Sequence, residues 1–189
     1  MNTRILSGVA GLSVAAIALV GCSAGEPVDL GDSGSSDSVL VAAIGGEPDQ
    51  LDPQRTSSYF SFEVLENVFD TLVEPDENLQ MQPALAESWE VSDDQLTWTF
   101  DLRDGVTFHD GSPFTSEDVV YSYRRIIDEE LANAWKFATV TDVSAPDEDT
   151  VVITVSQPTP NLLSNLGGFN GMAIVEQQNV ESGDITTAP

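Results

Sequence analysis

Cysteine and histidine are nearly absent from this sequence of 189 residues, which contains one of each. The lone cysteine, Cys22, excludes an internal disulfide, a CxxC redox pair and a cysteine-rich zinc site. A Ser-His-Asp triad would have to use His109, but its neighbours Asp110 and Gly111 favour a hydrogen-bonded turn histidine. The sequence has no GxSxG elbow, P-loop or GxGxxG motif. We therefore assign no catalytic residue and expect no enzyme; a hydrolase that uses His109 stays a secondary alternative.

Basic residues are also scarce, since 6 Lys and Arg face 32 Asp and Glu and the net charge is −26. Such a field repels nucleic acid and anionic lipid, so we expect neither as a partner. The acidic residues are spread along the chain, which is typical of a solvated surface. Clustered ligand spacing is missing, so we predict no metal site and no cofactor.

The N-terminus carries a targeting signal. Residues 1–4 include a positive charge, and a charge-free apolar run follows from Ile5 to Val20. This run is shorter than the roughly 20 residues that a membrane-spanning helix needs. It ends in Leu-Val-Gly-Cys at residues 19–22, which resembles the lipobox of bacterial lipoproteins. We predict a lipoprotein signal peptide at 1–21, lipidation of Cys22 and a flexible tether at 22–38; the alternative is an ordinary secretory signal that happens to contain a cysteine.

Hydrophobic patterns predict a mixture of helices and strands. Alternation at 95–103 indicates a strand, which we expect to form a hairpin with Val106 and Phe108. Thr115 and Asp118 form a capping box in front of an apolar helical stripe that reaches Ile127. We further expect strands at 39–44, 140–145, 150–155 and 172–175, and helices at 61–73 and 161–166. The absence of a steady βαβ rhythm predicts an α/β class with mixed α+β elements.

Tyr121 lies on the opposite side of the predicted helix from the apolar stripe. Its ring must therefore cover something other than the main core. Two interpretations stay open, namely packing on a loop with partial exposure and contact with a ligand.

Four ordered sequence blocks resemble one protein family. They lie at residues 47–53 (EPDQLDP), 83–94 (PALAESWEVSDD), 98–111 (WTFDLRDGVTFHDG) and 115–122 (TSEDVVYS). Together they resemble extracellular solute-binding proteins of family 5, the peptide and nickel binding components of ABC importers. The resemblance runs from about residue 39 to the end of the chain.

The resemblance implies a periplasmic-binding-protein-like fold of type II, with two lobes joined by a hinge and an extra domain inserted in the first lobe. Residues 39–54 would begin the first lobe, 55–165 would form the inserted domain and 166–189 would return to the first lobe. Family members are much longer, so we expect this chain to be an incomplete, N-terminal part of the fold, truncated at Pro189.

The same resemblance implies a function. The protein would be the substrate-binding component of an ABC importer, anchored by lipid on the extracellular or periplasmic side of the cell membrane. It would capture short peptides and deliver them to a permease and ATPase complex. Ser57, Ser58 and Tyr59 match a segment that pairs with the ligand backbone, and Tyr121 matches an aromatic that touches ligand. Oligopeptide binders can carry an acid at the position of Ser57, so a nickel chelate, an opine or a sugar stays an alternative ligand, and a surface lipoprotein without ligand is a third reading.

Overall fold

The computed structural model describes residues 41–169 and 171–186. The chain separates into two units, Met1–Val41 and Ala42–Pro189, and the helices and strands given below belong to the second. The predicted signal peptide, the lipidation site Cys22 and the tether lie outside the described residues. Within the described residues, no helix is long and apolar enough to cross a membrane.

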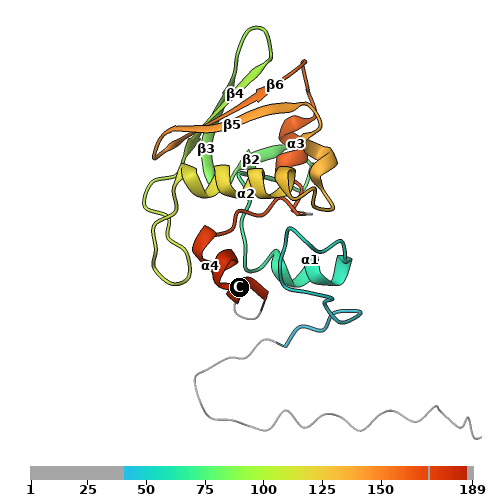
Figure 1. Ribbon diagram of the computed structural model, residues 1–189. Coiled ribbons are helices and arrows are strands. Elements are labelled where there is room, and N and C mark those ends of the chain that lie inside the picture. The colour runs from blue at the N-terminus through green and yellow to red at the C-terminus, as the bar shows by residue number, and fades with distance from the viewer. Residues whose placement is uncertain (1–40, 170, 187–189) are drawn as a thin grey trace, which may run out of the picture. The chain divides into compact units, whose positions relative to one another are not determined.

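The larger of the two sheets among the described residues has four antiparallel strands in the order β3-β4-β6-β5 (Figure 1). Its strands are β3 (Ala86–Val91), β4 (Thr97–Leu102), β5 (Val140–Asp147) and β6 (Thr150–Val155). In β4 and β6 every second side chain is buried, as expected for strands with one covered face. The register places Trp98 opposite Ile153 and Phe100 opposite Val151. The predicted strands at 95–103, 140–145 and 150–155 are therefore confirmed.

The predicted hairpin between the 95–103 strand and Val106 and Phe108 is wrong. Both edges of β4 are already occupied, by β3 and β6. The chain after β4 forms a loop instead, which is closed by a single bridge between Thr107 and Pro113. Strand β3 takes the expected place of the hairpin partner; it escaped prediction because only one of its six side chains, Ala86, is buried.

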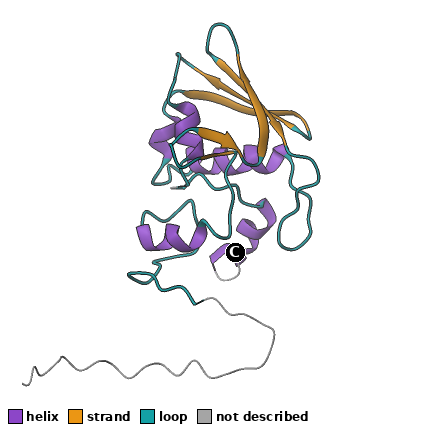
Figure 2. Cartoon of the chain, turned by 180° about the vertical axis from the view of Figure 1, so that it is seen from behind, coloured by secondary structure: helices purple, strands orange, loops and turns teal. Residues whose placement is uncertain are grey.

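Helix α2 (Ser116–Asp128) has the predicted capping box. The Asp118 carboxylate accepts hydrogen bonds from the Thr115 amide at 3.0 Å and from its hydroxyl at 3.1 Å. The helix buries Val119, Tyr123 and Ile126 at helical spacing and packs against β5 and β6. Figure 2 shows this helix lying along one side of the sheet. The capping box and the buried stripe confirm the predicted helix.

Thr115→Ala should lower the free energy of unfolding by about 1 kcal/mol, because the variant loses the hydroxyl of the capping box. Urea denaturation followed by circular dichroism measures the change. Thr107→Ala, which removes the same group from an exposed loop position, is the control and should stay within about 0.5 kcal/mol of the parent protein. Equal losses in both variants would contradict the capping role.

The remaining elements are short. They are α1 (Tyr59–Leu65), β1 (Val73–Pro75), β2 (Met81–Pro83), the 3-10 helix η1 (Ala134–Phe137), α3 (Leu162–Gly167), α4 (Gln177–Ser182) and η2 (Asp184–Thr186). Strands β1 and β2 form a separate antiparallel pair. Helix α3 confirms the helix predicted at 161–166.

Three predicted elements differ from the structure. The helix expected at 61–73 ends at Leu65, where the amides of Asn67 and Val68 bond to carbonyl oxygens three residues back instead of four. The described part of the strand expected at 39–44, residues 41–44, forms no strand. The segment expected as a strand at 172–175 is buried but joins no sheet. A strand needs a hydrogen-bonding neighbour, which local sequence preference does not supply.

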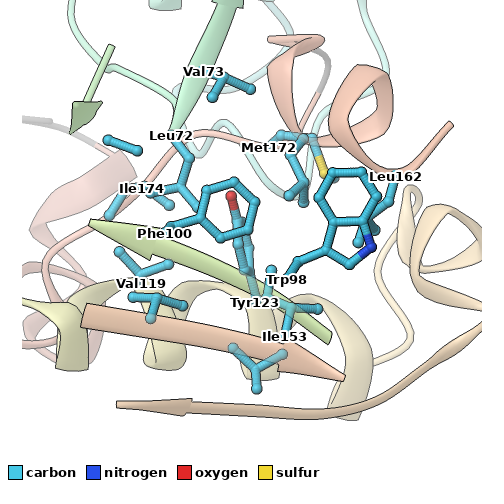
Figure 3. Packing of buried hydrophobic residues seen from close by; sticks show 14 of the residues in the cluster. Leu72, Val73, Trp98, Phe100, Val119, Tyr123, Ile153, Leu162, Met172 and Ile174 are labelled. Atoms are coloured by element: carbon cyan, nitrogen blue, oxygen red, sulfur yellow. The ribbon is translucent and has the colours of Figure 1, made fainter. Parts of the chain in front are cut away.

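The hydrophobic core brings together segments that are far apart in the sequence (Figure 3). Its members come from all six strands except β2, from α2, α3 and η1, and from the segments around residues 72 and 174. The residues labelled in Figure 3 are Leu72, Val73, Trp98, Phe100, Val119, Tyr123, Ile153, Leu162, Met172 and Ile174. The 172–175 segment thus packs against the sheet and helix layers although it forms no strand.

Tyr123 is fully buried, and its hydroxyl has no hydrogen-bond partner among the described residues. Burial raises the pKa of this hydroxyl far above its ordinary value. Tyr123→Phe removes the unsatisfied group while keeping the ring, so the free energy of unfolding should stay unchanged or rise by about 1 kcal/mol. Tyr59→Phe, at a side chain that is 70% exposed, should change the free energy of unfolding by no more than about 0.5 kcal/mol. A loss of stability in Tyr123→Phe alone, measured by urea denaturation, would contradict this account.

Candidate functional site

The segment between the turn at Asp52 and helix α1 carries the predicted ligand residues. Ser57 is exposed and Ser58 has an extended backbone with φ −78° and ψ 128°. Among the described residues, neither the amide nor the carbonyl oxygen of Ser57 has a hydrogen-bond partner. An exposed residue with both main-chain groups free can pair with an added strand. Ser57 thus presents two free main-chain groups on an exposed part of the described chain.

Asp52 anchors the start of this segment. Its carboxylate accepts hydrogen bonds from the Gln54 amide at 3.0 Å and from Arg125 at 3.2 and 2.5 Å. Its carbonyl oxygen accepts the amides of Arg55 and Thr56, both at 3.3 Å. Burial alone would lower the pKa of Arg125, but the hydrogen bonds and charge of Asp52 outweigh it and raise this pKa. The segment therefore starts from a buried ion pair.

Gln54 links this anchor to two distant segments. Its side-chain nitrogen donates to the carbonyl oxygens of Ser122 at 3.2 Å and Ala173 at 3.0 Å, while its side-chain oxygen accepts from Arg125 at 2.9 Å. Ser122 in turn accepts a hydrogen bond from the Val175 amide at 2.9 Å. The 52–56 segment, helix α2 and the 173–175 segment are thereby joined by buried hydrogen bonds.

A second carboxylate, Asp49, holds the segment from the other side. It accepts hydrogen bonds from the hydroxyls of Thr56 and Ser61, both at 2.6 Å. The Thr56 hydroxyl oxygen accepts the Ser58 amide at 3.0 Å. The hydrogen bonds from Ser61 and Thr56 lower the pKa of Asp49. A carboxyl with a lowered pKa in the folded state stabilises the fold above its ordinary pKa, and this contribution is lost as the pH falls through the lowered value.

Aromatic side chains border the segment. Tyr59 is 70% exposed, and its ring meets that of Phe60 edge to face with 6.2 Å between the centroids. The charge of Glu63 and a hydrogen bond to it raise the pKa of the Tyr59 hydroxyl. The Phe60 ring lies so close over Gly46 that a Cβ atom there would be 2.6 Å from the ring. These contacts fix the first turn of α1 next to Ser57.

Tyr121 is half-buried on α2, one turn before Arg125. Burial is the main reason for the raised pKa of its hydroxyl; the charges of Glu181, Glu129 and Asp52 raise it further, and that of Arg125 lowers it. Tyr121 therefore lies in the electrostatic range of the ion pair that anchors the Ser57 segment. Among the described residues, no hydrogen bond or ring contact joins Tyr121 directly to Ser57, Ser58 or Tyr59.

The anchoring residues were not predicted from the sequence. The guanidinium of Arg125 is buried and paired with Asp52. The sequence gives only an indirect indication that Arg125 has a buried acidic partner. Arg125 follows Ser122 by three residues on the buried side of α2, where an unpaired charge would be costly.

A cleft of about 530 Å³ lies elsewhere in the unit and contains His109 on its wall. Its lining mixes apolar and acidic side chains, and His109 is exposed. The nearby Ser112 hydroxyl donates to Glu176 at 2.9 Å, and the Ser112 amide donates to Asp110 at 2.8 Å. The Ser112 hydroxyl donates to Glu176 and not to His109, so this contact gives no support to the hydrolase alternative.

Comparison with known proteins identifies the family. Residues 80–189 match the family described as bacterial extracellular solute-binding proteins, family 5, middle part. The periplasmic murein peptide-binding protein MppA of Escherichia coli K12 is 32% identical over 173 residues, which cover 79% of this chain and 31% of MppA. The unliganded open form of MppA superimposes with a TM-score of 0.71 and 30% identity over 77% of this chain and 32% of that one.

Two ligand complexes are also similar. Haemophilus influenzae OppA in complex with the peptide RPPGFSPFR has a TM-score of 0.68 and 28% identity, over 73% of this chain and 30% of that one. AgaA of A. tumefaciens R10 in complex with agropinic acid has a TM-score of 0.69 and 30% identity, over 76% of this chain and 29% of that one. The chain thus spans about a third of the length of these relatives, and its mixed α/β fold is that of their corresponding part. From its sequence blocks, its fold and these similarities, the chain belongs to family 5 of the bacterial extracellular solute-binding proteins.

Proposed function

We propose that this chain is part of the substrate-binding component of an ABC importer that captures short peptides and delivers them to a membrane permease and its ATPase. The observation that carries the proposal is Ser57, which is exposed beside the extended Ser58 and whose amide and carbonyl have no partner among the described residues. A peptide that adds here as a strand forms main-chain hydrogen bonds, which give affinity without reading side chains. Ser57, Ser58, Tyr59 and Tyr121 are the proposed ligand-binding residues.

The binding cleft proposed here needs more chain than the described residues. Residues 39–54 and 166–189 would belong to the first lobe and 55–165 to its inserted domain, while a second lobe would close over the ligand from the other side. Ligand contacts to both lobes would shift the population toward the closed form, which is the form that docks on the permease. The names of MppA and OppA as peptide-binding proteins support this reading.

A binder of another small solute is the second candidate. AgaA, which was solved with agropinic acid, is as similar to this chain as the peptide-bound OppA. The site described above recognises main-chain groups, and an opine, a sugar or a nickel chelate would not form a strand there. Strand addition therefore favours the peptide.

Calorimetry tests the choice between these ligands. The complete reading frame that contains this sequence should bind members of an Ala-Xaa-Ala tripeptide library and release heat. Backbone N-methylation of the peptide at the residue opposite Ser57 removes one hydrogen bond and should weaken binding about tenfold. Binding of an opine or of nickel-histidine with no binding of any tripeptide would refute the peptide assignment.

We further propose that the mature protein is held at the membrane by lipid on Cys22, after removal of residues 1–21. The lipobox-like sequence at 19–22 supports this, and two acyl chains suffice for stable anchoring. Cells grown with radiolabelled palmitate should yield a labelled, membrane-associated protein, and Cys22→Ser should abolish the label. Unlabelled protein in the culture medium or periplasmic fraction would point to an ordinary secretory signal instead.

A further inference from the structure

Among the described residues, the hydrogen bonds around Asp52 leave the amide of Ser57 without a partner. Asp52 accepts the amide of Gln54 through its carboxylate and the amides of Arg55 and Thr56 through its carbonyl oxygen. The next occupied amide is that of Ser58, which donates to the Thr56 hydroxyl. The Ser57 amide lies between these occupied neighbours, so the contacts made by Asp52 and Thr56 limit the positions that it can take.

Arg125 in turn fixes the orientation of Asp52. Both side chains are buried, with exposed fractions of 4% and 1%, and the guanidinium contacts both carboxylate oxygens. Such a two-point contact holds a carboxylate in one plane, which a single contact does not. Gln54 adds a third contact to Arg125 and ties the arrangement to the backbone at Ser122 and Ala173.

A contact on the outer side completes the arrangement. The Arg55 side chain pairs with Glu129, and its other contact is Asp52 at 3.4 Å. Glu129 also lies 3.6 Å from Arg125. Arg55 and Arg125 therefore share the same two carboxylates, one on the segment and one at the end of α2. The segment is held against the helix that also carries Tyr121.

We propose that the Asp52–Arg125 pair, with Gln54, is a positioning device that holds the Ser57 main chain in its ligand-binding geometry before the ligand arrives. The inference rests on the proposed peptide-binding function. A buried ion pair is poorly explained by stability, since apolar residues of similar size often replace such pairs without loss. Its benefit here would be preorganisation, because a segment that is already ordered loses less entropy when the ligand binds.

The experiment uses the complete reading frame and separates positioning from folding. In Asp52→Leu/Arg125→Met, apolar side chains replace both charges, so the unfolding transition should stay close to that of the parent protein. Affinity for the tightest member of the Ala-Xaa-Ala library should nevertheless fall at least tenfold. The fall should lie mainly in the association rate, since only a fraction of molecules would present the competent segment.

A matched control is available one residue away. Arg124 forms an ion pair with Asp142 at 2.6 Å, which joins α2 to β5 but makes no contact with the 52–56 segment among those described. Arg124→Met/Asp142→Leu should leave the affinity within twofold of the parent protein. Hydrogen exchange provides a second readout. The amides of Gln54, Arg55 and Thr56 should exchange at least tenfold faster in the Asp52/Arg125 variant and unchanged in the control.

The outcomes are distinguishable. If the parent protein binds no tripeptide, the proposed function fails. If the parent protein binds and the folded Asp52→Leu/Arg125→Met variant binds equally well, the positioning inference fails while the function stands. Should that double variant not fold, Gln54→Leu replaces it and is expected to weaken binding through loss of the same contacts; unchanged affinity in this variant would overturn the inference.

Discussion

Arg125→Met is expected to lower the free energy of unfolding by about 3–5 kcal/mol, because it leaves the carboxylate of Asp52 buried without its partner. Removal of one member of a buried pair is much more costly than removal of both, since an uncompensated charge stays in a medium of low polarity. The variant also removes the guanidinium donor that hydrogen-bonds to the side-chain oxygen of Gln54. Urea denaturation followed by tryptophan fluorescence measures the loss.

Arg124→Met is the control for this prediction. Its side chain is 40% exposed and its partner Asp142 is 50% exposed. Exposed pairs contribute about 0–1 kcal/mol, so the control should lose no more than that. Equal losses in Arg124→Met and Arg125→Met would mean that Asp52 finds water or another partner, and that the pair is not the anchor described above.

The fold was predictable where the pattern is local. The alternation of β4 and β6 and the capping box at Thr115 each involve neighbours a few residues apart, and these elements are confirmed. The pairing partner of β4 was not predictable, because pairing is a contact between distant segments. In β3, buried and exposed side chains hardly alternate, so its sequence gives little indication of a strand. The apolar run at 41–44 likewise has strand preference but no neighbour among the described residues.

The site was predictable only in part and for the same reason. Resemblance to the family pointed to Ser57, Ser58 and Tyr59, but it gave no reason for their geometry. That reason is an ion pair between residues 73 positions apart in the sequence. Composition and spacing cannot reveal such a pair, since 32 acidic residues leave many formal partners for each arginine. Only the folded chain selects Asp52.

Phe100→Ala should produce a loss of similar size, about 3–5 kcal/mol. Phe100 is fully buried in the centre of β4, where it lies opposite Trp89 on one neighbouring strand and Val151 on the other. Figure 3 shows its ring among side chains from the helix, the sheet and the segments around residues 72 and 174. A cavity there removes contacts to several layers together, and a β4 backbone held by two strands cannot collapse to fill it.

The control removes the same aromatic ring from a more exposed position. Phe60→Ala removes a ring that is 36% exposed and lies against Gly45 and Gly46, so its loss should be less than half that of Phe100→Ala. Urea denaturation compares both variants with the parent protein. The slope of the unfolding free energy against urea concentration should be equal in all three proteins. The free energy of unfolding of a small domain is only about 5–15 kcal/mol in total. Phe100→Ala should therefore also unfold at a distinctly lower temperature than the parent protein. A loss no larger than that of Phe60→Ala would show that the sheet and α2 do not depend on a shared core. It would then contradict the view that this core rigidly supports the Ser57 segment.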